Sequence, residues 1–274
     1  MRLLNAYNAQ GQKLWRLGTT SCIYEMPLLE NVRRLAGKTE DIELIYYDNE
    51  WGSNWPSPSE TAELRNLAAQ YNISYTVHIP SALDGVVCSR EWEERAYAQV
   101  GRTIEFLEDL APAAYVWHWE AELRGKQPSA DVPGWLGAVQ RLAERVAAAR
   151  WIPPRRLAVE TLSYPFELIA DLVSAYDFGI TLDVGHLWAG GYDWERSVKI
   201  YGPRTKVVHL HGIEPDTRKD HNSLIHQPPE QLLRLGNLLA NIADGQPRTV
   251  TLEVFAEDDW LLSQNLLRRL WQCL

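Results

Sequence analysis

Several residues that commonly ligate divalent metals stand where predicted β-strands end. The clearest case is Thr181-Leu182-Asp183-Val184-Gly185-His186, in which an Asp ends an apolar strand and a His follows three residues later. Asp and His are both common ligands of divalent transition metals. A single Asp after a strand is more often a turn former, and it is the recurrence along the chain that favours a metal site. The strand-end residues are His78, His118, Glu160, Asp183, His209 and Glu253.

Two of these carboxylates lie in otherwise apolar segments. Glu160 ends Leu157-Ala158-Val159-Glu160, and Glu253 ends Val250-Thr251-Leu252-Glu253. A strand-end His or Glu taken singly is commonly a hydrogen-bonded or solvated residue. Burial of a lone carboxylate among apolar strands is costly unless the carboxylate is paired or bound to a metal. The set therefore predicts a metal centre.

The expected ligands indicate which metals would bind. His186, and His221 in the loop after the seventh strand, can reach the same centre. Together with the six strand-end residues they make five imidazoles and three carboxylates. This donor set suits Zn²⁺, Mn²⁺, Co²⁺ or Fe²⁺ better than Mg²⁺. His211 shares the face of His209 by strand alternation and is expected to support a ligand. Trp117 and Trp119 flank His118, so their side chains point to the opposite face of that strand, toward the helices, where they are expected to pack.

Strands and helices are expected to alternate eight times along the chain, which predicts parallel strands joined by crossover helices. Eight such units in this length predict one α/β domain, a (β/α)8 TIM barrel over residues 1–274, with residues 1–14 as an N-terminal hairpin that turns near Gly11. The expected strands are Arg16–Thr20, Ile42–Tyr47, Ser74–Ile79, Ala114–Trp119, Arg156–Thr161, Gly179–Asp183, Lys206–His211 and Thr249–Phe255. The expected helices are Leu28–Ala36, Ser57–Tyr71, Ser89–Leu110, Pro133–Arg150, Pro165–Ala175, Trp194–Ile200, Pro229–Ala243 and Asp258–Cys273. The carboxyl ends of all strands of such a barrel meet at one face, where the metal site is expected.

Composition restricts the partners. The 274 residues carry a net charge of -9 without a run of Lys or Arg, which disfavours nucleic acid as a partner. Cys22, Cys88 and Cys273 are widely spaced, which fits a reducing compartment without disulfides. We expect no signal peptide and no membrane span, and hence a cytoplasmic protein. Aromatic residues in loops are expected either to contact a substrate or to pack; these are Trp51, Trp55, Trp188 and Tyr192.

Over essentially its whole length the sequence resembles the xylose isomerase-like TIM-barrel superfamily, which includes endonuclease IV. The isomerases and epimerases of this superfamily hold one divalent metal, and the matching positions here are Glu160, Asp183, His209 and Glu253. The nucleases hold three metals with additional histidines, and His78, His118, His186 and His221 match these. Lys219 stands where the nucleases have an Asp two residues before the last His, so the resemblance implies two ions more firmly than three.

Shorter stretches are similar to the cobamide-remodelling phosphodiesterases. That resemblance implies hydrolysis of the nucleotide-loop phosphodiester of adenosylcobamides such as pseudocobalamin, with cobinamide phosphate as a product. The stretches are Gly18-Thr19-Thr20-Ser21-Cys22-Ile23-Tyr24, Asn31-Val32-Arg33-Arg34-Leu35-Ala36, Tyr75-Thr76-Val77-His78-Ile79-Pro80, Leu182-Asp183-Val184-Gly185-His186-Leu187 and Asp220-His221-Asn222-Ser223-Leu224.

The resemblance also implies roles. Glu160 would bridge two metals that clamp a phosphodiester, and Glu253 would ligate one metal or orient water. A third metal or the phosphate would contact His186, His221 and Lys219. The alternatives are a single-metal sugar or sugar phosphate isomerase or epimerase, a barrel that binds its ligand without turnover, and a DNA-repair nuclease, which the net charge disfavours.

Overall fold

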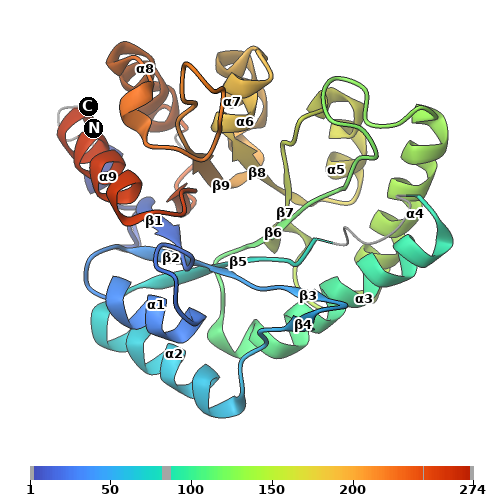
Figure 1. Ribbon diagram of the computed structural model, residues 1–274, viewed down its shortest axis with the longest axis horizontal. Coiled ribbons are helices and arrows are strands. Elements are labelled where there is room, and N and C mark those ends of the chain that lie inside the picture. Colours follow the sequence, from blue (N-terminus) through green and yellow to red (C-terminus); the bar gives the residue numbers. More distant parts are fainter. Residues whose placement is uncertain (1–2, 82–87, 243, 272–274) are drawn as a thin grey trace.

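The computed structural model describes residues 3–81, 88–242 and 244–271, and its centre is a closed barrel of eight parallel strands with helices around it (Figure 1). The order around the barrel is β1-β10-β9-β8-β7-β6-β5-β2. The predicted TIM barrel is therefore confirmed. The barrel strands are β1 (Trp15–Thr20), β2 (Asp41–Ile45), β5 (Ser74–His78), β6 (Tyr115–Trp117), β7 (Leu157–Glu160), β8 (Gly179–Asp183), β9 (Thr205–Leu210) and β10 (Arg248–Leu252).

The helices lie outside the barrel in the positions that crossover connections require. Helix α2 begins with the capping box that its sequence predicts, because the Ser57 hydroxyl accepts from the Glu60 N–H while the Glu60 carboxylate accepts from the Ser57 N–H. The α-helices are α1 (Leu28–Leu35), α2 (Pro58–Tyr71), α3 (Arg90–Leu107), α4 (Val132–Ala149), α5 (Ala170–Ala175), α6 (Val184–Ala189), α7 (Trp194–Tyr201), α8 (Pro229–Ala240) and α9 (Glu257–Trp271).

Alternation along each strand separates two buried environments. Outward residues such as Leu157 and Val159 of β7 join the large apolar core between barrel and helices, where Trp117 and Trp119 also pack, as predicted. Inward residues form a small separate apolar cluster of Ala114, Val116, Ala158 and Val207, and the polar residues of the same faces lie above and below it. Side chains alternate between the two faces of a strand. Each strand-end ligand candidate is an even number of residues from an inward-facing residue of its own strand, so it also points into the barrel.

Some local predictions were wrong. Residues 48–53 form a short antiparallel pair, β3 (Asp48–Asn49) with β4 (Gly52–Ser53), where only a loop was expected. Helix α6 begins immediately after Asp183, so His186 lies in a helical turn and not in a loop. Residues Leu3–Asn5 form a 3₁₀ helix, and the hairpin that turns near Gly11 is limited to residues 6–14, where the Tyr7–Lys13 bridge is flanked by backbone hydrogen bonds between Asn8 and Gln12 and between Leu14 and Ala6. The expected helix ends at Ala243 and Cys273 lie outside the described residues.

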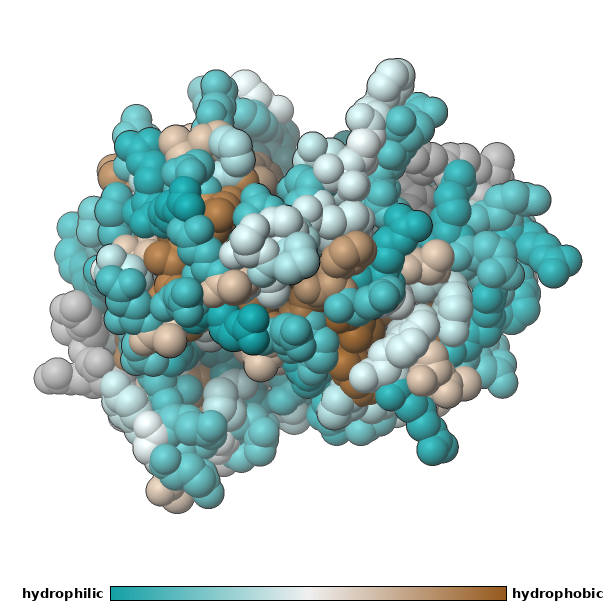
Figure 2. Space-filling model, turned by 90° about the horizontal axis from the view of Figure 1, so that it is seen from below, coloured by the Kyte–Doolittle hydropathy of each residue, from teal (hydrophilic) through white to brown (hydrophobic). Residues whose placement is uncertain are grey.

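The surface is mainly polar. Figure 2 shows one face on which hydrophilic residues predominate and hydrophobic residues form small separate patches. Among the described residues, no helix combines the length and the apolar character that a membrane crossing needs. Cys22 and Cys88 are both free thiols, and Cys273 lies outside the described residues.

One buried acid makes the stability of the barrel depend on pH. Asp41 has no exposed surface and accepts hydrogen bonds from Ser74 and Thr76. Burial and the nearby Glu43 raise the pKa of the Asp41 carboxyl to about 7, against the lowering effect of the hydrogen bonds from Ser74 and Thr76. Because the folded-state pKa lies above the unfolded value, the neutral carboxyl stabilises the fold at low pH, and this contribution is lost as pH rises through 7.

We therefore expect Asp41→Asn to gain stability relative to the wild type as pH rises from 4 to 8. A gain of roughly 4 kcal/mol in the free energy of unfolding follows from the size of the pKa change. Denaturant unfolding at both pH values measures it, with Asp171→Asn at an exposed position of α5 as the control for a lost charge. The same stability difference between Asp41→Asn and the wild type at pH 4 and at pH 8 would contradict this account of Asp41.

Candidate metal centre

All six strand-end candidates meet at the carboxyl end of the barrel. His78, Glu160 and Asp183 are the last residues of their strands, and His209 is the last but one residue of β9. His118 and Glu253 directly follow β6 and β10. Their ligand atoms form two groups, in each of which all atoms lie within 4.8 Å of one another: His78, His118 and Glu160 in the first, and Glu160, Asp183, His209 and Glu253 in the second.

The first group has one carboxylate facing two imidazoles. The Nε2 atoms of His78 and His118 lie 3.2 Å apart, and the Glu160 Oε2 lies 2.8 Å from the His118 Nε2. The Nδ1 of His78 is 3.0 Å from the Ile79 carbonyl oxygen and is therefore the nitrogen that donates a proton. This leaves the Nε2 of His78 as the atom with a free lone pair, directed at the group.

The second group shares Glu160 with the first. The Nδ1 of His209 lies 3.2 Å from the Glu160 Oε1 and 3.2 Å from the Glu253 Oε2. Asp183 is fully buried beside them, with its Oδ2 4.0 Å from the same nitrogen. The two oxygens of Glu160 thus face different groups, so this carboxylate can offer one oxygen to each.

Metal ions fit these residues because buried acceptor atoms lack proton donors. Among the described residues, the Asp183 Oδ2 and the Glu253 Oε2 have no hydrogen-bond partner. Histidine nitrogens lie 3.0 Å and 3.2 Å from these two oxygens, but their directions are not those of hydrogen bonds. An orphaned buried carboxylate oxygen is costly, and a divalent cation would satisfy it.

The charges of the two groups compensate one another. Burial alone would raise the pKa of the Glu160 carboxyl, but His209 and His118 outweigh it and hold that pKa at about 2. The pKa of Glu253 is likewise well below its usual value, because His209 and His221 outweigh the effect of burial. Burial lowers the pKa of His118, yet Glu160 and Glu120 raise it well above 6.5. Without metal the protons on the imidazoles neutralise the acids, so metal uptake must displace these protons.

A third group contains only histidines, His186, His211 and His221. Helix α6 positions His186, whose N–H is capped by the Asp183 Oδ1 at 2.7 Å. The Nδ1 of His211 accepts from the His221 N–H at 3.1 Å, which leaves its own proton on Nε2, 3.4 Å from the Asp183 Oδ1. The His211 Nε2 thus lies near Asp183, but among the described residues it has no hydrogen-bond partner, and the supporting role of His211 stays a prediction. Gly185 is required beside it, since a Cβ there would lie 2.3 Å from the His211 Nε2.

Two carboxylates near the ligands were not predicted. Glu43 of β2 is fully buried with its Oε2 3.0 Å from the His209 Nε2, and Glu120 lies with its Oε1 3.7 Å from the His118 Nδ1. The Glu43 contact orients a metal-ligating imidazole and fixes its tautomer, whereas Glu120 is too far for a hydrogen bond and acts on His118 through its charge. Glu43 could have been predicted from the sequence, because in Asp41-Ile42-Glu43-Leu44 it lies within a strand beside apolar residues, as Glu160 does in its strand.

The aromatic residues expected either near a substrate or in packing differ in their environments. Trp51 is 87% exposed at the β3–β4 turn. Trp55 stacks on Tyr46 and Phe106 at 5.3 Å and 5.2 Å between ring centres. Of the two roles expected for Trp55, its ring therefore has the packing role.

The remaining two aromatic residues follow β8. Trp188 lies in α6 and not in a loop, and Tyr192 lies just beyond this helix; both are partly buried. The Tyr192 hydroxyl donates to the Ser163 carbonyl at 2.7 Å. Lys219 is exposed in the loop that the Gly212–Asn222 bridge closes, and it belongs to none of the three groups.

The family with the description "Xylose isomerase-like TIM barrel" matches residues 38–270. The chain belongs to this family. Among curated proteins, no sequence matches the chain. The family match covers the segment that contains all the ligand candidates, so the three groups described above are features of a member of the xylose isomerase-like TIM barrel family.

Solved structures with the same fold include both epimerases and nucleases. A D-tagatose 3-epimerase-like protein has 18% identity and a TM-score of 0.74, over 94% of this chain and 97% of its own. The 3-keto-D-glucoside 4-epimerase of E. coli has 16% identity and a TM-score of 0.68, over 94% and 99%. Endonuclease IV from Thermus thermophilus has 18% identity and a TM-score of 0.67, over 94% and 100%. At these identities the likeness extends to the fold alone.

Because Glu160 is the residue common to the first two groups, Glu160→Gln should lower metal content by at least one equivalent per chain. The amide oxygen is a much weaker ligand than a carboxylate oxygen, so we expect the remaining metal to bind at least about tenfold more weakly. Plasma emission analysis after dialysis measures the content, and Glu167→Gln at an exposed position after β7 is the matched control. Unchanged metal content in Glu160→Gln would contradict the shared position of Glu160.

Proposed function

We propose that this protein is a divalent-metal-dependent phosphodiesterase that hydrolyses the nucleotide-loop phosphodiester of adenosylcobamides, such as pseudocobalamin, to cobinamide phosphate. The observation that carries the proposal is the position of Glu160, with one oxygen in a group that contains His78 and His118 and the other beside His209. A second metal-ligand group joined by a shared carboxylate suits a reaction in which two oxygens on one phosphorus are stabilised at once.

We assign two ions of Zn²⁺, Mn²⁺, Co²⁺ or Fe²⁺ to the first two groups. Bound there, such ions supply Lewis-acid stabilisation of phosphate oxygens and activation of water. The third group lacks a carboxylate of its own, and we assign His186 and His221 to contacts with the phosphate.

The residues of the chain position the reacting groups. Glu43 holds His209 through its Nε2, and the Ile79 carbonyl holds His78 through its Nδ1, so each imidazole presents its other nitrogen to the centre. Glu253 lies between His209 and His221, where one of its oxygens would ligate the metal and the other could accept a proton from water. The oxygen of that water forms the new bond to phosphorus, the bond from phosphorus to the nucleoside oxygen breaks, and His221 at 3.4 Å from Glu253 returns a proton to the leaving oxygen.

The substrate is proposed from charge and resemblance together. The net charge of -9 disfavours a polyanionic nucleic acid, whereas a cobamide presents one phosphodiester and a large apolar macrocycle. Trp51 at the β3–β4 turn, with Trp188 and Tyr192 after β8, offers aromatic surface for such a ligand. Lys219 is exposed in the loop after β9, where it can approach the phosphate.

The second candidate function is a single-metal sugar or sugar phosphate epimerase. It is favoured by the second group alone, since Glu160, Asp183, His209 and Glu253 already provide four ligands. For that reaction the first group has no function. The two candidates therefore differ in what they require of His78 and His118.

The test is incubation of metal-reconstituted protein with adenosylpseudocobalamin, followed by chromatography and mass spectrometry. We expect cobinamide phosphate as a product, and a loss of at least about 100-fold in rate for His78→Ala and His118→Ala, since each removes a ligand of one metal. His226→Ala, a histidine outside all three groups, should retain the rate.

Cleavage that survives in both His78→Ala and His118→Ala would contradict the two-metal proposal. Absence of cleavage with any of the four metals, together with turnover of a ketose, would establish the epimerase.

A further inference from the structure

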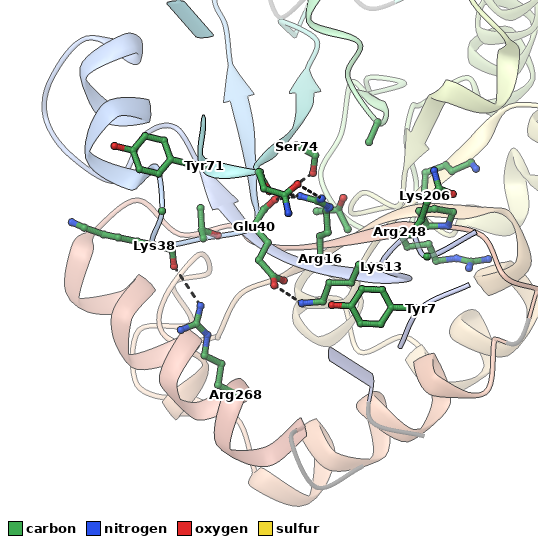
Figure 3. A pocket seen from close by; sticks show the side chains of 18 residues that line it. Tyr7, Lys13, Arg16, Lys38, Glu40, Tyr71, Ser74, Lys206, Arg248 and Arg268 are labelled. Atoms are coloured by element: carbon green, nitrogen blue, oxygen red, sulfur yellow. Dashed lines mark hydrogen bonds and ion pairs between the residues drawn. The ribbon is translucent and has the colours of Figure 1, made fainter. Parts of the chain in front are cut away.

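A large cavity lies at the opposite end of the barrel from the metal ligands. It has a volume of about 840 Å³ and is lined at the amino ends of the strands by Arg16, Ser74 and Arg248 (Figure 3). The N-terminal turn contributes Tyr7 and Lys13 to the wall, and the loops before β2 and β5 and the last turns of α9 complete it. The ligand groups described above lie at the carboxyl ends of the same strands, so this cavity is separate from them.

Positive charge dominates the lining. Among the described residues that line it, Glu40 is acidic, and six are cationic: Lys13, Arg16, Lys38, Lys206, Arg248 and Arg268. Lys13 is paired with Glu40, and Arg248 is paired with Asp244. Within the part of the chain that the structure describes, none of the other four cations has a carboxylate within ion-pair distance; these are Arg16, Lys38, Lys206 and Arg268.

The contacts of these cations hold them in place without neutralising them. Arg16 donates to the carbonyl oxygens of Glu40 at 2.8 Å and Asn72 at 2.9 Å, and Arg268 donates to the Lys38 carbonyl at 3.4 Å. Burial lowers the pKa of Lys206, and the charge of Arg248 lowers it further. In a chain with a net charge of -9, this is a local concentration of unneutralised positive charge in a concave site, which attracts anions.

The cations are spread around the cavity. Figure 3 shows Arg16 near the middle beside Glu40 and Ser74, Lys206 beside Arg248 at one side, and Lys38 and Arg268 at the other. A single small anion would contact only one part of this array, whereas a molecule with two separated anionic groups would contact two parts. Guanidinium and ammonium groups together are the usual ligands of phosphate.

We propose that this cavity binds a small molecule that carries two separated phosphate groups, a sugar bisphosphate. One phosphate contacts Arg16 near the middle of the cavity, and the other contacts Arg268 and Lys38 at its side. Tyr71, 44% exposed on the same wall as Lys38, and Tyr7, 60% exposed near Lys13, provide ring faces for the remainder of the ligand. Binding at this end does not depend on which reaction the metal centre catalyses.

The test is isothermal titration of the metal-loaded full chain at about 150 mM salt, where weak surface attraction is screened. The probes are fructose 1,6-bisphosphate, ADP and inorganic phosphate. We expect saturable binding of one bisphosphate per chain, and a weaker or absent signal for inorganic phosphate. Tighter binding of fructose 1,6-bisphosphate than of ADP supports two separated phosphate contacts, and tighter binding of ADP would contradict them.

The double variant Lys38→Ala/Arg268→Ala locates the site, because both side chains are exposed and their loss leaves the core intact. It should weaken bisphosphate binding at least tenfold and leave metal content unchanged. The matched control is Arg196→Ala/Lys199→Ala, which removes the same two charge types from exposed positions of α7. No saturable binding of fructose 1,6-bisphosphate, or equal weakening in the control, would overturn the proposal.

Discussion

The carboxylate of Glu160 is enclosed in protein and cannot be solvated, so its charge must be balanced by neighbours. His118 and His209 lie 2.8 Å and 3.2 Å from its two oxygens, and each of these imidazoles has a further acid behind it. Three carboxylates and several imidazoles in one buried space are stable only as a compensated set, with protons or with metal ions. The barrel supplies that set by bringing the carboxyl ends of six strands to one place.

The polar character continues through the interior of the barrel. Ser74 at the amino end donates to Asp41, Thr76 bonds to both Asp41 and Glu43, and Glu43 reaches His209 at the carboxyl end. The apolar part of the interior is reduced to a small cluster of short side chains. The stability of the fold therefore depends chiefly on the outer layer between strands and helices, which leaves the interior free to carry charged groups.

The fold and most of the candidate site could be predicted because both depend on local patterns. Strand alternation placed Glu160 and Asp183 inside the barrel, and eight strand–helix units specified a closed sheet. The hydrogen bond between Glu43 and His209 joins residues 166 positions apart, and only the closure of the barrel brings them together. Spacing alone could not choose between the two roles of Trp55, because its packing depends on Phe106 of α3. The cationic cavity was missed for the same reason, since its charges come from dispersed parts of the chain.

The most direct measurement of the central claim is anomalous diffraction from crystals of the protein grown with Mn²⁺ or Zn²⁺. If Glu160 joins two metal sites, the difference map will contain two peaks on either side of its carboxylate. One will lie against His78 and His118, and the other against Asp183, His209 and Glu253. A single peak in the second group, with His78 and His118 contacting only protein, would contradict the claim.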